Sequence, residues 1–120
     1  MREADLQRCI ANYLTYLMNQ GKLYFDRLNS GSVLVKRGDK TYRVELCREG
    51  TADFMVIRTR QYFRNAPQVI APEIIFLELK GDKGKQSQAQ KDFQDSIEAQ
   101  GTEYHVIRSI QELEEILETD

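Results

Sequence analysis

The chain is poor in cysteine, histidine and proline. Its 120 residues include only two cysteines, Cys9 and Cys47, and one histidine, His105. Two isolated cysteines and one histidine cannot form a structural zinc site of the usual CxxC type. We expect two buried thiols, because a reducing cytosol disfavours the alternative, a disulfide between them.

Segments that direct a chain to a membrane are also missing. No apolar run approaches the roughly 20 residues that a membrane-spanning helix needs. Residues 1–14 mix acidic with basic side chains and contain no continuous apolar stretch, so they are unlike a secretory signal. We therefore expect a cytoplasmic protein with no membrane partner. The length fits one ordinary domain over residues 1–120.

The net charge of −2 hides an uneven distribution along the chain. Residues 1–92 carry 16 Lys and Arg against 11 Asp and Glu, whereas residues 93–120 carry one against eight. A basic region can face phosphates while an acidic end faces elsewhere. Ordinary solvated surface charge explains the same pattern, and charge alone favours that simpler explanation.

Hydrophobic periodicity predicts one helix, five strands, a second helix, a sixth strand and a last helix. An apolar stripe at spacings of three and four predicts a helix over residues 2–19, ended by Gly21. Two β-branched runs around Gly38 predict a hairpin. The order implies a single α/β domain with helices packed on a mixed central β-sheet. The predicted strands are 22–28, 33–36, 41–46, 52–59, 73–80 and 103–108, the later helices are 86–100 and 110–118, and residues 60–72, with Pro67 and Pro72, are a predicted loop.

Polar residues interrupt the apolar pattern at the end of strand 73–80. Side chains alternate between the two faces of a strand, so Glu78 and Lys80 share one face with Phe76. A Glu and a Lys two residues apart form a common pattern. On these two residues alone, a salt bridge at a sheet edge is the simpler explanation.

The helix that follows adds two amides on its core-facing side. Gln86 and Gln90 lie at its N-terminal end, on the side that carries its apolar stripe. Buried amides need hydrogen-bond partners, and the polar end of the preceding strand is the nearest candidate. The alternative is a helix that starts late, with Gln86 on the surface.

Two further carboxylates belong to the same hypothesis. If strand 52–59 pairs with strand 73–80, Asp53 approaches Glu78, and a hard cation such as Mg²⁺ relieves their repulsion. An Asx-turn is the more ordinary role for Asp53 taken alone. Glu3 lies on the apolar stripe of the first helix and either caps that helix or points into the site; both roles stay open.

Taken in order, these pieces resemble a known nuclease family. The sequence is similar to the VRR-NUC (virus-type replication-repair nuclease) family of the PD-(D/E)xK superfamily. Ala52 departs from the pattern, because the superfamily often has proline before the aspartate. The matching pieces are the helix with Glu3, "RLNSG", "GTADFMVI", "FLELKGDKGKQSQAQKDF" and "GTEYHVIRSIQELEEIL".

The resemblance implies a restriction-endonuclease-like core and a Mg²⁺- or Mn²⁺-dependent endonuclease that cuts DNA in repair, recombination or replication. Stand-alone members look like dimeric Holliday-junction resolvases, so we expect a four-way junction as substrate, a homodimer, and a bacterial or phage origin. The implied catalytic residues are Asp53, Glu78, Lys80, Gln90 and Glu3. Asp53, Glu78 and the backbone carbonyl of Leu79 are the implied metal ligands.

If the chain is such a nuclease, the cations near its implied catalytic residues are predicted to contact phosphates. For any single one, a solvated loop charge explains it at least as well. Tyr62 and Phe63 either stack on an unpaired base or, as we favour, anchor a loop on the core. The predicted DNA-binding residues are Lys83, Lys85, Arg58, Arg60 and Arg64.

Other functions stay open at this point. The same chemistry suits a nuclease that cuts flaps, single strands or specific duplex sites. A non-catalytic module that binds branched DNA is a second alternative. The third is a protein-interaction domain that uses the acidic last helix.

Overall fold

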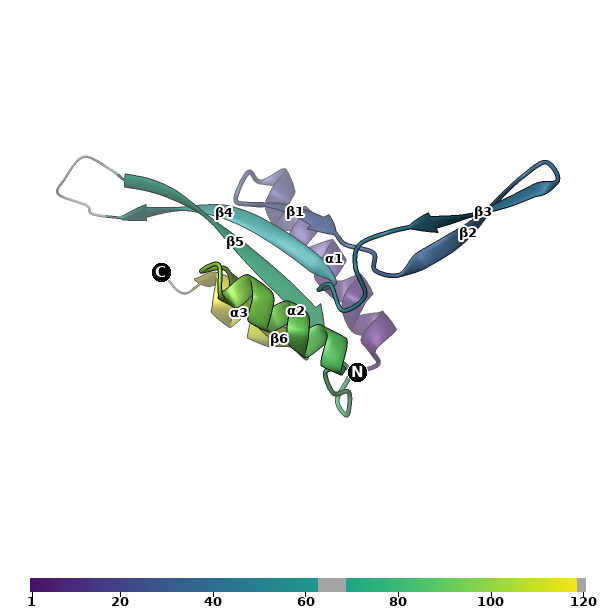
Figure 1. Cartoon of the computed structure of the whole chain (residues 1–120). Helices are drawn as coiled ribbons and strands as arrows, with labels where there is room; N and C mark the ends of the chain where they lie inside the picture. Colours follow the sequence, from purple (N-terminus) through teal and green to yellow (C-terminus); the bar gives the residue numbers. More distant parts are fainter. Residues whose placement is uncertain (63–68, 119–120) are drawn as a thin grey trace.

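A four-stranded mixed sheet forms the centre of the computed structural model (Figure 1). The structure describes residues 1–62 and 69–118; the side chains of residues 60–62 and 69–70 lie outside the description. The predicted order of helices and strands is confirmed. The elements are α1 (Glu3–Asn19), β1 (Tyr24–Arg27), β2 (Ser32–Arg37), β3 (Lys40–Glu45), β4 (Phe54–Tyr62), β5 (Val69–Leu79), α2 (Gln88–Glu98), β6 (Glu103–Ile107) and α3 (Ile110–Glu118).

The strands of the sheet follow the order β1-β4-β5-β6. β4 is antiparallel to both β1 and β5, whereas β5 and β6 are parallel. Parallel neighbours need a long crossover connection, which here contains α2. β5 is therefore a central strand, as predicted, and it carries Glu78 at its end.

Helices cover both faces of this sheet. On one face, the apolar stripe of α1 and Leu113 of α3 pack on the sheet to form the core. On the other face, Phe93 of α2 meets Phe76 of β5 edge-to-face, with ring centroids 5.3 Å apart. The fully buried side chains of the core include Leu6, Ile10, Leu14, Phe54, Val56, Ile75, Leu77 and Ile107.

The predicted loop at residues 60–72 is wrong at both of its ends. β4 continues to Tyr62, and β5 begins at Val69. Pro72, taken from the sequence as a loop marker, lies inside β5 opposite Thr59. Because β6 pairs with β5 only from Ile75 onward, Pro72 lies where its missing N–H is tolerated.

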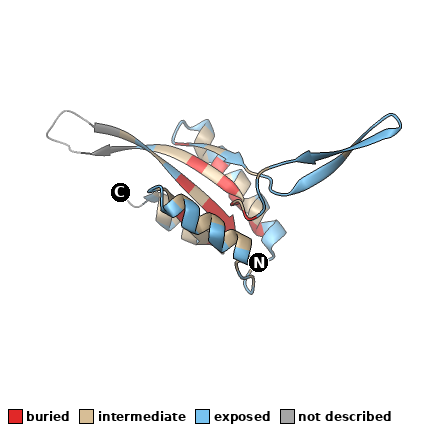
Figure 2. Ribbon diagram, in the orientation of Figure 1, coloured by how far each residue is buried: buried red, intermediate tan, exposed pale blue. Residues whose placement is uncertain are grey.

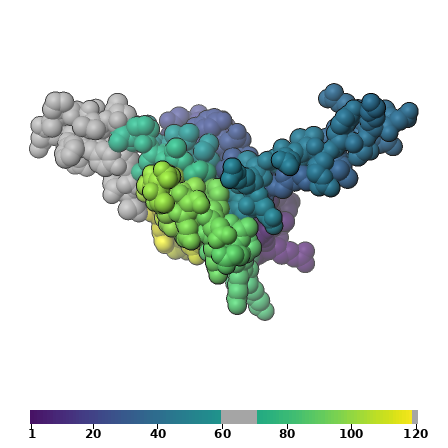
Figure 3. Space-filling view, viewed as in Figure 1, coloured from purple at the N-terminus to yellow at the C-terminus, as the bar shows by residue number. Residues whose placement is uncertain are grey.

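β2 and β3 form the predicted hairpin, which stands away from the body of the molecule (Figures 1 and 3). Its two strands pack on each other and on no other described helix or strand. The register places Val33 beside Val44 and Val35 beside Tyr42, so one face of the hairpin is apolar. Nearly all of it is exposed (Figure 2).

Cys9 and Cys47 are free thiols, as favoured over a disulfide, although each is only partly buried. Within the described part of the chain, no helix is both long enough and apolar enough to cross a bilayer.

A shortened hairpin tests whether the body folds without this arm. When residues 35–42 are replaced by Asn-Gly, we expect the melting temperature to stay within about 2 °C of wild type, because the hairpin adds no side chain to the core. Leu113→Ala is the control, since it empties a fully buried position and should cost about 2–5 kcal/mol. Circular dichroism measures both. A large fall in the shortened variant would mean that the arm stabilises the body.

Candidate active site

The polar residues singled out in the sequence meet where β5 ends and β4 begins. The antiparallel register pairs Phe54 with Leu77, so Asp53, just before β4, lies across from Glu78. The side chain of Asp53 reaches across to β5, where Oδ2 accepts a hydrogen bond of 2.7 Å from the backbone N–H of Leu79. The Asp53 side chain therefore connects the start of β4 to β5 and does not form an Asx-turn in its own loop.

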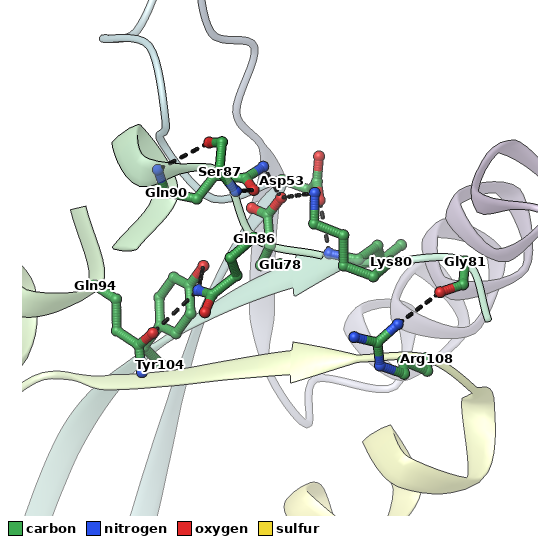
Figure 4. A network of polar contacts seen from close by, with 11 residues as sticks. Asp53, Glu78, Lys80, Gly81, Gln86, Ser87, Gln90, Gln94, Tyr104 and Arg108 are labelled. Atoms are coloured by element: carbon green, nitrogen blue, oxygen red, sulfur yellow. Dashed lines mark hydrogen bonds and ion pairs between the residues drawn. The ribbon is translucent and has the colours of Figure 1, made fainter. Parts of the chain in front are cut away.

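Glu78 is a buried carboxylate with an incomplete set of partners (Figure 4). Its Oε1 accepts a hydrogen bond of 2.5 Å from Nε2 of Gln90 and lies 3.8 Å from Nζ of Lys80. Its Oε2 is buried and has no hydrogen-bond partner among the described residues. A buried charge needs compensation, so this oxygen marks a place where a cation or proton is favoured.

The electrostatics of the two carboxyls agree with this geometry. Burial, and then the charge of Asp53, raises the pKa of Glu78 to about 8, whereas Lys80 and Gln90 act to lower it. Burial also raises the pKa of Asp53, against the opposing hydrogen bond from Leu79. Two carboxyls with raised pKa values side by side are typical of functional sites, although buried structural groups also show such shifts.

Gln90 joins the start of α2 to this site. Ser87 is the N-cap of α2, and its hydroxyl accepts a hydrogen bond of 3.1 Å from the backbone N–H of Gln90. In return, Oε1 of Gln90 accepts from the N–H of Ser87, which completes a capping box. The carbonyl of the Gln90 amide is thus fixed by the cap, so its NH₂ group points at Glu78.

The turn before Asp53 presses against the same end of α2. Gly50 has a φ of +90°, and a Cβ built there would lie 2.3 Å from the backbone oxygen of Ala89. A side chain at this position is excluded both by the backbone conformation and by the contact. Gly50 thus lets the Asp53 turn and α2 approach closely.

Gln86 does not reach the site, contrary to our expectation for both glutamines. Its Nε2 donates to the hydroxyl of Tyr104 and to Oε1 of Gln94, at 3.1 and 3.0 Å. The helix does start late, at Gln88, but Gln86 is partly buried rather than a surface residue. Its amide binds β6 to α2 on the face that carries the site.

Glu3 lies at the edge of the site. It is the first residue of α1, it is exposed, and the N-cap position belongs to Arg2. Its negative charge helps to raise the pKa of both Asp53 and Glu78. Glu3 is therefore within electrostatic range of the two carboxyls.

The chain matches no family model, no curated protein and no solved structure. Asp53 and Glu78 present hard oxygen atoms, which Mg²⁺ and Mn²⁺ prefer, and the buried Oε2 of Glu78 fits such an ion. Among the described residues, no group of three or more His, Cys, Asp or Glu side chains is arranged to hold a metal.

Arg58, one of the predicted phosphate contacts, lies away from the candidate site. Its guanidinium donates to Glu73 at 2.5 Å and to the carbonyls of Leu117 and Ile116 at the end of α3. Along β4, Arg58 shares the face of Val56 and Phe54, opposite to that of Asp53. We therefore remove Arg58 from the DNA-contact hypothesis, because it is partly buried and joins α3 to the sheet.

The other predicted cations differ in what the structure describes. Lys83 and Lys85 are exposed in the loop between β5 and α2, and Lys83 shares a surface depression with Glu3. The Arg60 and Tyr62 side chains, and the whole of Phe63 and Arg64, lie outside the described residues.

Two arginines near the site were not predicted. The charge of Arg27, on β1, acts to lower the pKa of Asp53. Arg108 directly follows β6, and its Nη1 donates to the carbonyl of Gly81 at 2.7 Å. The positions of both arginines near the site follow from the strand order, because β1 flanks β4 and the end of β6 lies beside the end of β5. A sequence pattern does not show which strands are neighbours.

The raised pKa of Glu78 predicts how stability depends on pH in EDTA. Because its folded-state pKa of about 8 exceeds the ordinary value of 4.5, the folded protein binds the extra proton between these values. The free energy of unfolding should therefore fall as pH rises through this window, by at most about 1.4 kcal/mol per pH unit from this group. Glu78→Gln should flatten the fall and be more stable than wild type at pH 8.5.

Urea denaturation at several pH values measures this dependence. Asp95→Asn, which removes an exposed carboxylate of α2, is the matched control and should keep the wild-type profile. Parallel profiles for wild type and Glu78→Gln would contradict the raised pKa.

Gly50→Ala tests the contact between the Asp53 turn and α2. We expect a larger loss of stability than for Gly21→Ala, because a positive φ alone costs about 1–3 kcal/mol and Gly50 adds a backbone collision. Gly21 has a φ of +74° but open space around it, so it isolates the conformational cost. Equal losses in urea denaturation would rule out the close approach.

Proposed function

We propose that this protein is a metal-dependent DNA endonuclease with a restriction-endonuclease-like, PD-(D/E)xK core. The observation that carries the proposal is the meeting of Asp53, Glu78 and Lys80 at adjacent strand ends, with one Glu78 oxygen buried and unpaired. The family resemblance to VRR-NUC nucleases supports it, since the same residues fill the positions of that motif. No other described cluster combines paired acids, a lysine and a fixed amide.

In this proposal, Asp53 and Glu78 hold a divalent cation together with the backbone carbonyl of Leu79. Oδ2 of Asp53 is engaged with the Leu79 N–H, which orients the carboxylate. Bound Mg²⁺ or Mn²⁺ would lower the pKa of a water and offset negative charge on the scissile phosphate. Below about pH 8, a proton competes for Glu78, so metal affinity should rise with pH.

Lys80, Gln90 and Glu3 orient the reacting groups and stabilise charge in this proposal. Lys80 places its ammonium beside Glu78, where it positions the attacking water or offsets charge that develops on the phosphate. Gln90 holds Glu78 in one conformation through the capping box. Glu3 holds an outer water at the open edge of the site.

Branched DNA is the proposed substrate, with the four-way junction as the first choice. Resolution of a junction requires two cuts, and a two-fold dimer supplies two sites. A homodimer is therefore part of the proposal. A flap, single-strand or duplex-specific nuclease is the alternative if the chain acts as a monomer.

The decisive experiment is cleavage of a panel of labelled junction, flap, single-stranded and linear DNA with Mg²⁺ or Mn²⁺. We expect nicking of the junction and at least about 100-fold slower cleavage by two variants. Asp53→Asn removes an anionic oxygen from the proposed metal site, and Lys80→Ala removes a positive charge that would offset negative charge in the transition state. Lys22→Ala is the matched control, because Lys22 is exposed and follows the end of α1 that is opposite to Glu3. Light scattering in the same buffers gives the oligomeric state.

Folding and metal binding are measured beside cleavage. Mn²⁺ should raise the melting temperature of wild type more than that of Asp53→Asn, because a ligand that binds only the folded state stabilises it. Salt-sensitive binding without cleavage in either metal would instead indicate a non-catalytic DNA-binding module. If no DNA is bound or cut, the acidic last helix becomes the surface to examine for a protein partner.

A further inference from the structure

A groove of about 430 Å³ lies beside the candidate active site, over the edge strand β6. Its floor includes Val106, which is the neighbour of Glu78 in the parallel pairing of β5 with β6. Registered residues of parallel neighbours point to the same face, so the groove opens on the face that carries Glu78. The lining residues are Lys85, Gln86, Lys91, Val106, Arg108 and Glu112.

The groove brings together cations from three separate segments. Lys85 comes from the loop after β5, Lys91 from the first turn of α2, and Arg108 from the end of β6. Lys85 and Lys91 are exposed, and Arg108 is partly buried. The carboxylate of Glu112 also lines the groove, but its Oε2 accepts a hydrogen bond of 2.7 Å from the backbone N–H of Arg108. Three positive charges therefore face one negative charge that is already engaged.

Arg108 is the fixed member of this set. One of its five N–H donors is used, by Nη1, on the carbonyl of Gly81. That bond holds the guanidinium next to the loop that follows Lys80, as Figure 4 shows. The charge of Arg108 also acts to lower the pKa of Asp82, an exposed carboxylate that is already ion-paired with the N-terminal amine. A guanidinium held by one hydrogen bond suits a phosphate, which accepts two parallel hydrogen bonds.

We propose that this groove binds the phosphodiester backbone of the DNA strand on one side of the cut, with Arg108 as the main contact and Lys85 and Lys91 flanking it. This inference rests on the proposed function, since it takes Glu78 as the position of the scissile phosphate. A DNA strand that runs from Glu78 across β6 passes through the groove. The bases contribute little, because the groove offers cations and one engaged amide, Gln86.

The test uses the double variant Lys85→Gln/Lys91→Gln, because neither lysine side chain forms a hydrogen bond or ion pair with any other described residue. Kd is measured for a labelled junction in Ca²⁺, by fluorescence anisotropy, over a range of salt concentrations. We expect Kd to rise about tenfold and the slope of log Kd against log salt to fall by about one for each cation removed. Arg108→Gln should weaken binding as well, and Arg108→Lys should restore part of it.

The control is Arg8→Gln/Lys22→Gln. It removes one exposed cation of α1, the helix on the other face of the sheet, and one exposed cation in the turn after that helix. It should leave Kd and the salt slope unchanged. A second arm uses splayed substrates that extend on only one side of the cut. The Lys85→Gln/Lys91→Gln variant should bind more weakly than wild type to substrates that extend to one side of the cut. It should bind as tightly as wild type to substrates that extend to the other side.

The outcomes separate the two proposals. If wild type cuts DNA but the groove variant keeps its affinity and salt slope on every substrate, the groove proposal is overturned and the nuclease proposal stands. If the variant shows the expected losses while no metal supports cleavage, the groove binds DNA and the nuclease proposal fails. An equal loss on both sides of the cut also overturns the proposal, since it assigns one side only.

Discussion

The buried carboxylate of Glu78 is the constraint on which this end of the molecule depends. A charge removed from water must be paired, hydrogen-bonded or neutralised. Here one oxygen has Gln90 and Lys80, while the other is buried without a partner among the described residues. A purely structural salt bridge between Glu78 and Lys80 would not need Asp53 to approach and raise the pKa of Glu78 further. Two carboxyls placed together, one of them buried with an unpaired oxygen, lower the stability of the fold. The same placement suits the binding of a cation.

Three segments that are distant in sequence are locked together around this carboxylate. The turn with Gly50 packs on Ala89 of α2, Asp53 binds the backbone of Leu79, and Gln90 connects the N-cap of α2 to Glu78. Ordinary devices of helix and strand termination, a capping box and a glycine turn, therefore also set the geometry of the site.

The arginines show why charge by itself is a weak guide to function. Arg58 and Arg108 both follow apolar strand residues, and both bond to backbone carbonyls. Arg58 is directed to the face that carries α3 and is enclosed there, whereas Arg108 lines a groove beside Glu78. The difference arises from the face of the sheet on which each side chain lies, not from the residue type. The exposed hairpin likewise carries cations beside an apolar face.

Local patterns were enough to predict most of the elements and much of the site. Helical spacing predicted α1, and strand alternation put Glu78 on the face opposite Leu77 and Leu79. The joint position of Asp53, Glu78, Lys80 and Gln90 followed from one assumption about strand pairing. These inferences succeed because caps and periodicity act over a few residues.

The tertiary structure alone decided which groups face one another across the sheet. Pro72 lies inside β5 at a point where β6 does not pair with that strand, Arg58 is engaged by a helix nearly 60 residues later in the chain, and Arg108 lies at the site because β6 runs parallel to β5. Gln86 bonds to Tyr104 for the same reason. Each outcome depends on contacts between segments far apart in sequence, whose pairing and register no short pattern contains.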